Sequence, residues 1–144
     1  MRGEALALLA RREHSRRELA RKLAARGHDP ADIGRALDEL GTSGLLSDAR
    51  MAELYVAERL AKGFGPLRVR QELRERGLAD ELADPLLDLP AHDWFARMAQ
   101  VAAKKYGPNP PSDPKECARR ARFLEYRGFS ADLIARFLRG DEVD

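Results

Sequence analysis

Apolar residues recur every three or four positions along most of the chain, which is the spacing of one face of an α-helix. No segment alternates apolar and polar residues with period two, so we expect essentially no strand. The helical segments are separated by short breaks rich in Gly, Pro and helix-capping residues. The pattern therefore predicts an all-α protein.

Three of these segments end in the same way, at Leu23–Gly27, Leu73–Gly77 and Leu124–Gly128. Their spacing of about 50 residues falls within the range of repeat proteins. In each copy the Leu is expected in the core, and the Arg lies where a cation suits the helix dipole by ~0.3–1 kcal/mol. The Gly is expected to take the left-handed C-cap. At this point a capping role is the favoured interpretation of these arginines.

Helix start signals divide the chain further. Ser15 and Glu18 form a capping box, and Asp29-Pro30 is an N-cap followed by a first-turn proline. Pro85 interrupts a helical segment, where we expect a kink or a short first turn. Further expected starts are Ser47, Pro66, Asp113-Pro114 and Ser130.

Three helices per repeat give three modules, with expected boundaries 1–46, 47–89 and 90–144. The third is less regular, because it contains a Pro-rich loop at 107–114. Register also fails there at Arg120, which takes the place of Leu19 and Val69. The predicted architecture is a tandem array of three three-helix repeats, with residues 140–144 frayed.

Composition indicates in which cellular compartment the protein is expected. The chain has 144 residues, a formal net charge of +2 and one cysteine, so no disulfide framework is possible and a reducing compartment is expected. No apolar run approaches the ~18–20 residues that span a membrane. The apolar stretch 5–10 is too short for a signal peptide and has no cleavage site. We expect a cytoplasmic protein without a membrane partner.

Charge is segregated among the helices. The middle helix of each repeat is rich in arginine, whereas acidic residues gather in the third helices. Stacked repeats would place the arginines along one basic edge that faces DNA phosphate or an acidic protein surface. The alternative is a solvated face with local ion pairs, worth ~0.3–0.5 kcal/mol each. The residues assigned to this basic edge are Arg16, Arg17, Arg21, Arg68, Arg70, Arg74, Arg119 and Arg122.

The sequence gives little support for metal binding, nucleotide binding or catalysis. His14, His28 and His92 lack metal-ligand spacing, and Cys117 has no partner cysteine and is expected as a small core residue. No Gly-rich phosphate loop and no nucleophile with a paired base is present. We expect no metal, no cofactor and no enzymatic activity.

Several segments resemble the bacterial RecX family. Residues 6–23 are similar to its first repeat, and 45–52 with Tyr55 and Arg59 to the start of its second. The Gly65–Gly77 segment, GPLRVRQELRERG, resembles the most recognisable part of that family. Residues 122–129 resemble its third-repeat ending. These matches occur in family order and cover nearly the whole chain.

The resemblance implies an elongated, curved array of three three-helix repeats and a regulator of the RecA recombinase. Such a protein lodges in the groove of the RecA filament on single-stranded DNA and opposes filament extension. It thereby lowers the ATPase, strand-exchange and co-protease activities of RecA, and so modulates homologous recombination and the SOS response. Some members also bind DNA, so single-stranded or double-stranded DNA is a further expected partner. We expect a monomer.

Two features depart from the family pattern. The chain begins directly at the first helix, so any N-terminal extension is expected to be missing, and Pro85 with the 107–114 loop could alter repeat packing. An alternative function is a direct DNA binder built from helix-turn-helix-like units. The acidic third helices, which would have to read the DNA, argue against it.

Overall fold

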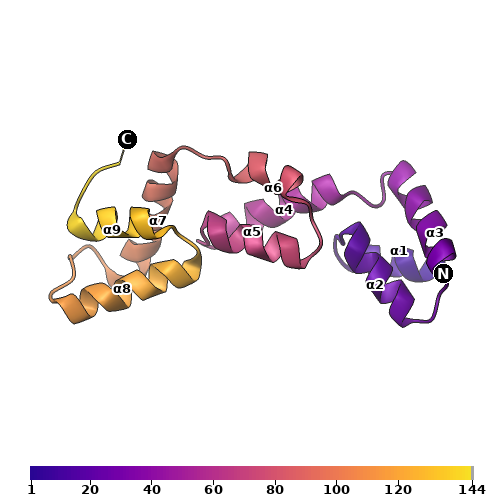
Figure 1. Cartoon of the computed structure of the whole chain (residues 1–144), viewed down its shortest axis with the longest axis horizontal. Helices are drawn as coiled ribbons and strands as arrows, with labels where there is room; N and C mark the ends of the chain where they lie inside the picture. Colours follow the sequence, from indigo (N-terminus) through magenta and orange to yellow (C-terminus); the bar gives the residue numbers. More distant parts are fainter. Residues whose placement is uncertain (144) are drawn as a thin grey trace. The chain divides into compact units, whose positions relative to one another are not determined.

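The computed structural model describes residues 1–143 and contains nine α-helices and no strand within that range (Figure 1). The all-α prediction is confirmed. The helices are α1 Arg2–Arg11, α2 Arg16–Ala25, α3 Pro30–Thr42, α4 Asp48–Ala61, α5 Pro66–Glu75, α6 Asp80–Leu87, α7 Ala91–Tyr106, α8 Pro114–Arg127 and α9 Ala131–Arg139.

The helix starts follow the capping signals. The Ser15 hydroxyl accepts from the Glu18 N–H at 3.0 Å, and the Ser15 N–H donates back to the Glu18 carboxylate at 3.1 Å. Asp29, Asp113 and Ser130 each accept from a main-chain N–H in the first turn of their helices. Each bond satisfies a donor that a helix leaves unpaired at its N-terminus.

Two helices contain a residue of a type that commonly ends a helix. α3 continues through Gly41 and ends at Thr42, and it is Gly44 that takes a positive φ, of 79°. α6 continues through Pro85 and ends two residues later. A proline near the end of a helix removes only one intrahelical hydrogen bond, which is why a short helix can contain it.

The first three helices bury a common core. Leu19 and Leu23 on one face of α2 are fully buried, together with Leu37 and Leu40 of α3 and Ala5 of α1. Burying one such leucine stabilises a fold by ~1.5–3 kcal/mol. The core is made of leucine, isoleucine and alanine, as the low aromatic content predicts.

The chain divides into two compact units. Unit 1 comprises Met1–Tyr55 and Glu72–Pro85, and unit 2 comprises Val56–Gln71 and the chain from Leu86 onward. Helices α4, α5 and α6 therefore contribute residues to both units. The repeat boundaries at 46 and 89 stay a prediction. In unit 2 the buried side chains include Met98 of α7, Leu124 of α8 and Phe129.

Candidate partner-binding surface

In unit 1, a joint forms between the start of α2 and the end of α5. The buried Ser15 hydroxyl donates to the carbonyl oxygen of Arg76 while it caps α2. The Arg76 guanidinium lies 4.7 Å from the centroid of the Tyr55 ring and 3.5 Å from the Glu18 carboxylate. Arg76 therefore joins residues of two successive repeats, a role beyond helix capping.

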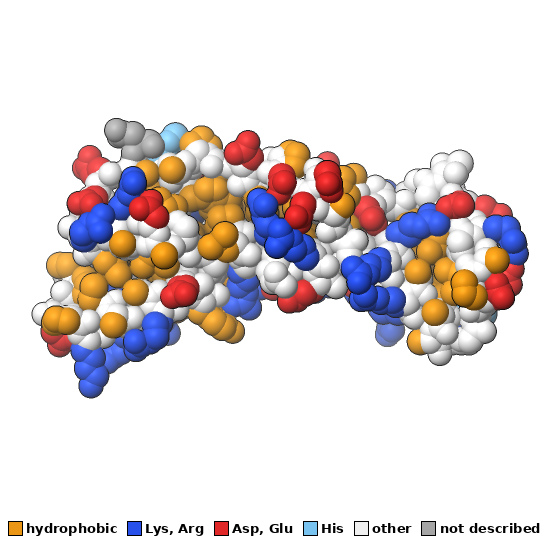
Figure 2. Space-filling view, in the orientation of Figure 1, with side chains coloured by type: hydrophobic (Ala, Val, Ile, Leu, Met, Phe, Trp, Pro, Cys, Tyr) orange, Lys and Arg blue, Asp and Glu red, His pale blue; other side chains and the backbone are white. Residues whose placement is uncertain are grey.

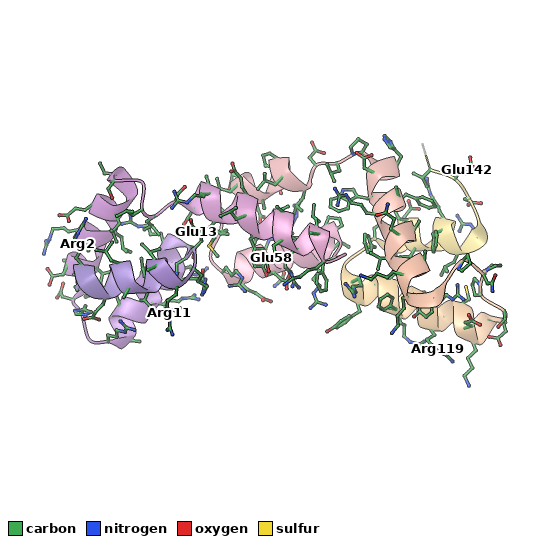
Figure 3. The ribbon with its side chains drawn as sticks, turned by 180° about the vertical axis from the view of Figure 1, so that it is seen from behind. Arg2, Arg11, Glu13, Glu58, Arg119 and Glu142 are labelled. Atoms are coloured by element: carbon green, nitrogen blue, oxygen red, sulfur yellow. The ribbon has the colours of Figure 1, made fainter. Side chains whose placement is uncertain are left out.

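The start of α4 is bound to the same part of unit 1. The Arg16 N–H donates to the Asp48 carboxylate at 2.8 Å, and Arg50 donates to Glu13 at 2.6 Å. Glu13, labelled in Figure 3, belongs to the loop between α1 and α2. These polar contacts fix the N-terminus of α4 against the first repeat.

Unit 2 contains the corresponding joint between the start of α5 and the end of α8. The Gly65 N–H donates to the Arg127 carbonyl oxygen at 2.7 Å, and the Leu67 N–H donates to the Gly128 carbonyl oxygen at 3.0 Å. The Arg127 guanidinium donates to the Lys62 carbonyl oxygen at 2.9 Å. In both units, the Arg-Gly end of one middle helix thus meets the beginning of the preceding one.

The glycines of the two joints are needed for close approach as well as for positive φ. A methyl group added at Gly128 would lie 2.7 Å from the Arg68 main-chain nitrogen, and one at Gly77 would lie 2.5 Å from the Arg17 side chain. At Gly27, in the first repeat, an added methyl group meets nothing within 4 Å. The repeated glycine therefore combines a helix cap with a repeat-packing contact.

His14 is a buried polar residue of unit 1 that the sequence did not single out. Its Nδ1 lies 3.0 Å from the Arg12 carbonyl oxygen, and its Nε2 lies 2.8 Å from the Lys22 ammonium. A carbonyl only accepts and an ammonium only donates, so these partners select the neutral imidazole. Burial lowers the pKa of His14 below 6.5, and the nearby charges of Arg12 and Lys22 act in the same direction.

Four of the predicted basic-edge arginines belong to unit 1, and all four are exposed. Arg16 pairs with Asp38 at 2.7 Å, and Arg74 pairs with Asp80 at 2.8 Å, so acidic residues of the third helices partly neutralise the middle helices. Within residues 1–143, no carboxylate pairs with Arg17 or Arg21.

The other four belong to unit 2 and differ in burial. Arg68 and Arg70 are half-buried, unlike the exposed arginines of unit 1. Arg68 lies over the rings of Phe64 and Tyr126, at 4.5 and 4.6 Å from their centroids, because it packs at the joint. Arg119 and Arg122 are exposed, and the described chain holds no carboxylate partner for either.

The figures locate these charges. Figure 2 shows Lys and Arg side chains along α8 and Asp and Glu side chains over α6. Figure 3 shows Arg11 at the end of α1 and Arg119 on α8. Four of the eight arginines thus belong to unit 1 and four to unit 2, and a single basic edge through all eight stays a prediction.

Unit 2 also holds a basic cavity that the sequence reading missed. It has a volume of about 440 Å³ and lies between the C-terminal turn of α4, α7 and α8. The signal was present in α7, where Arg97, Val101 and Lys104 recur at helical spacing with no acidic residue after Asp93. Its cationic lining residues are Lys62, Arg97, Lys104, Lys105 and Arg127.

Arg120 explains the irregular register of the third repeat. It is buried like Leu19 and Val69, with 8 % of its surface exposed, and it donates to the Asn109 carbonyl oxygen at 2.9 Å. It also donates to Glu116 at 2.5 Å and lies 4.8 Å from the Tyr106 ring centroid. Arg120 therefore holds the Pro-rich loop at a position where the first two repeats have an apolar core residue.

Other chemistry is sparse in the part of the chain that the structure describes. Residues 1–143 contain no group of His, Cys, Asp and Glu side chains that could hold a metal ion. Among these residues, no helix is both long enough and apolar enough to cross a bilayer. Cys117 is half-buried rather than a core residue, because it borders an open groove between α8 and α9.

Comparison with family models gives three matches in chain order. The first three-helix domain of RecX matches residues 2–40, the second matches 47–87 and the third matches 92–138. Among solved structures, RecX from Lactobacillus salivarius has a TM-score of 0.80 at 23% identity, over 96% of this chain and 92% of that one. That likeness supports the fold of tandem three-helix domains.

Relatives with the name regulatory protein RecX match more closely in sequence. The one from Halorhodospira halophila is 48% identical over 134 residues, which is 93% of this chain and 83% of that protein. The one from Ectopseudomonas mendocina is 48% identical over 140 residues, which is 97% of this chain and 93% of that protein. With three domain models matched in order and relatives of this identity, the chain belongs to the RecX family of regulatory proteins.

Proposed function

We propose that the protein binds the RecA nucleoprotein filament and inhibits its extension, ATPase, strand-exchange and co-protease activities. It would thereby modulate recombinational DNA repair in the cytoplasm without being an enzyme. The observation that carries the proposal is the match of all three RecX domains, in order, together with relatives named as regulatory proteins.

The exposed arginines of the middle helices suit this role. A RecA filament on DNA offers acidic side chains and phosphates, and an unpaired surface guanidinium can donate two hydrogen bonds to either. Arg17 and Arg21 on α2, and Arg119 and Arg122 on α8, are exposed and have no ion pair among residues 1–143 that binding would break. Each such contact is weak, and several repeats together would sum many of them.

The remaining four arginines have other contacts as well. Arg16 and Arg74 would have to leave Asp38 and Asp80 or bind as ion pairs. Arg68 is held between Phe64 and Tyr126 at the joint of unit 2, which gives it a structural task. We therefore assign the main contacts to Arg17, Arg21, Arg119 and Arg122, and a supporting part to the other members of the basic edge.

We further infer that the protein acts as a monomer. The Arg-Gly end of α2 is occupied within its own repeat, since Glu4 accepts from Arg26 at 3.3 Å and lies 3.0 Å from His28. At the start of α8, Ser112 donates to Glu116 at 2.6 Å. Neither end therefore presents an open joint to a second copy.

The proposal is tested by measuring ATP hydrolysis by RecA on single-stranded DNA with increasing amounts of the purified protein. Inhibition at or below one copy per RecA subunit is expected. Hydrolysis that stays at the uninhibited rate at stoichiometric protein would refute the proposal. Filament length in electron micrographs provides a second readout, because a block of extension shortens filaments.

A further inference from the structure

The loop between α1 and α2 holds the joint of unit 1 together. The Ser15 hydroxyl of this loop donates to the Arg76 carbonyl oxygen at the end of α5. Its Glu13 carboxylate accepts from Arg50, near the start of α4, at 2.6 Å. The position of the loop therefore decides whether α4 and α5 stay attached to the first repeat.

His14 lies in this loop between Glu13 and Ser15, and only 1 % of its surface is exposed. Its Nδ1 lies 3.0 Å from the Arg12 carbonyl oxygen, and its Nε2 lies 2.8 Å from the Lys22 ammonium. Because an ammonium group can only donate, Nε2 must accept and must carry no proton. The ring thus fits the closed joint in its neutral form alone.

A proton on Nε2 would turn this contact into two donors that face each other. Lys22 can turn away to solvent, but the buried imidazolium would then keep an N–H without an acceptor, which is costly. Water supplies the acceptor, and water reaches a ring that is buried to this extent only when the loop moves. Protonation of His14 therefore favours an open joint.

The surrounding charges do not compensate the imidazolium. Burial lowers the pKa of His14, the charges of Arg12 and Lys22 lower it further, and only Glu18 acts in the opposite direction. The Glu18 carboxylate already accepts from Arg12 at 3.1 Å and from the Ser15 N–H at 3.1 Å. The charged groups around the loop are Arg12 and Glu13 within it, Glu18 and Lys22 from α2, Asp48 and Arg50 from α4, and Arg76 from α5.

The joint of unit 2 has a different residue in the corresponding place. The repeat that aligns Leu19 with Val69 aligns His14 with Phe64. Three guanidinium groups lie 3.8, 4.5 and 4.7 Å from the centroid of the Phe64 ring. Because a phenyl ring takes up no proton, the chain contains one joint with a titratable side chain at this position and one without.

We propose that His14 makes the joint of unit 1 an acid-operated switch, in which protonation of the ring releases the loop from α4 and α5 while the joint of unit 2 stays closed. The switch goes beyond the proposed function and does not depend on it, since it needs no partner. Release would also detach α2, which carries Arg17 and Arg21, from the end of α5.

Amide hydrogen exchange of the purified protein between pH 7.5 and 5.5, corrected for the intrinsic rate at each pH, measures the opening of each joint. The Arg16 N–H, which donates to Asp48 at 2.8 Å, reports on unit 1, and the N–H groups of Gly65 and Leu67 report on unit 2.

An open joint returns His14 to water and to its ordinary pKa of 6.5. The opening constant at Arg16 should therefore increase by up to about tenfold over this pH range, and the constants at Gly65 and Leu67 by less than about twofold. An Arg16 constant that changes by less than about twofold, or an equal increase at both joints, would overturn the switch.

Two variants test the role of the ring. His14→Phe copies the residue of the unit 2 joint and should abolish the increase at Arg16. Lys22→Gln keeps the histidine and replaces the ammonium by an amide oxygen that accepts from the imidazolium. The protonated ring can then stay in the joint, so the increase should also disappear. A full increase in Lys22→Gln would overturn the proposal even if His14→Phe does not fold.

His28→Gln is the matched control, because His28 is the other histidine of unit 1 and contacts Glu4 of α1 rather than the loop. The increase at Arg16 should persist in this variant. An increase that disappears in H28Q, or survives in H14F, would assign the pH dependence to a group other than His14.

Discussion

The main-chain N–H of Gly65 donates to the carbonyl oxygen of Arg127 at 2.7 Å, which joins the start of α5 to the end of α8. In unit 1 the Ser15 hydroxyl donates to the carbonyl oxygen of Arg76 in the equivalent place. The acceptor in both joints is the main chain of the arginine that precedes the repeated glycine. Side-chain identity at that arginine therefore matters less for the joint than the close approach that the glycine permits.

The three repeated glycines should differ in their tolerance of alanine. All three have positive φ, which costs an L-residue ~1–2 kcal/mol. Gly27→Ala should lose only that amount, whereas Gly77→Ala and Gly128→Ala should lose ~1–3 kcal/mol more, because their methyl groups would overlap Arg17 and Arg68. Urea unfolding measures the free energy of each variant.

Gly128→Ala should be the most harmful, since its methyl group meets main-chain atoms that cannot rotate away. Gly27→Ala serves as the control for backbone strain alone. Equal losses at the three positions would mean that the glycines act only as helix caps and that the joints tolerate displacement.

A core leucine and a surface leucine of α5 provide a second test. Leu73 is fully buried, and Leu73→Ala should lower the free energy of unfolding by ~2–5 kcal/mol through lost burial and a cavity. Leu67 is 56 % exposed, and Leu67→Ala should change the free energy by less than ~0.5 kcal/mol. Thermal or urea unfolding of both variants checks the prediction, and similar losses would contradict the assignment of Leu73 to the core.

Stability should fall on acidification just below pH 6.5 because of His14. Its pKa is lowered in the folded protein, chiefly by burial, so the unfolded chain takes up a proton at a higher pH than the folded one. The unfolded state then binds more protons, and the free energy of unfolding decreases as pH falls from 6.5 toward the lowered pKa. Urea unfolding between pH 5 and 7.5 measures the decrease.

Protonation of carboxylates also lowers the stability of the protein, but over a lower pH range. Burial raises the pKa of Glu18, but hydrogen bonds from Arg12 and Ser15 outweigh it, so its folded pKa lies below 4.5. His14→Gln should therefore flatten the curve between pH 5 and 6.5 and leave the fall below 4.5 in place. A wild-type slope that survives in His14→Gln would assign the effect to another group.

The hydrogen bond from Ser112 at the start of α8 should be visible in the titration of Glu116. Its pKa is lowered to about 2, first by the hydrogen bond from the Ser112 hydroxyl and then by the bond from Arg120. Ser112→Ala should raise this pKa toward the ordinary value of 4.5, and Arg120→Met should raise it by a smaller amount. Carboxyl NMR titration measures both, and an unchanged pKa in Ser112→Ala would rule out the Ser112 hydroxyl as the main cause of the lowered pKa.

Local patterns predicted the helices and their caps, since Ser15 with Glu18 and Asp29 with Pro30 carry their signals within a few residues. The repeat of Leu and Gly also identified buried leucines such as Leu73. Contacts between residues far apart in sequence could not be read in this way. The stacking of Arg68 on Tyr126 follows from repeat packing, which helical periodicity does not describe.

The sequence likewise predicted some features of the candidate site and missed others. Arginine-rich segments predicted which helices carry charge, but not which cations are paired, because Asp38 and Asp80 reach Arg16 and Arg74 only in the folded chain. The basic cavity was missed because its lining comes from three separate helices. At Arg120 the sequence showed that the register of the third repeat fails. Only the fold shows the reason, which is that Arg120 is buried and bound to the Pro-rich loop.

Charge reversal should separate partner contact from structural support. Arg21→Glu and Arg122→Glu alter exposed side chains that have no ion pair within residues 1–143, one in each unit. Because a surface charge contact is worth up to ~1 kcal/mol, each reversal should raise the half-inhibitory concentration against RecA ATPase about fivefold, and the double variant about 25-fold. Their unfolding midpoints should match the wild type.

Arg68→Glu should behave differently, since it removes the stacking on Phe64 and Tyr126 and the hydrogen bond to the Tyr126 carbonyl oxygen at 3.1 Å. It should lower the free energy of unfolding by ~1–3 kcal/mol and weaken inhibition through the damaged joint. If R21E/R122E has the same half-inhibitory concentration as the wild type, Arg21 and Arg122 make no partner contact and are only solvated surface residues. A simultaneous loss of stability in R21E/R122E would instead give them the structural task that we assign to Arg68.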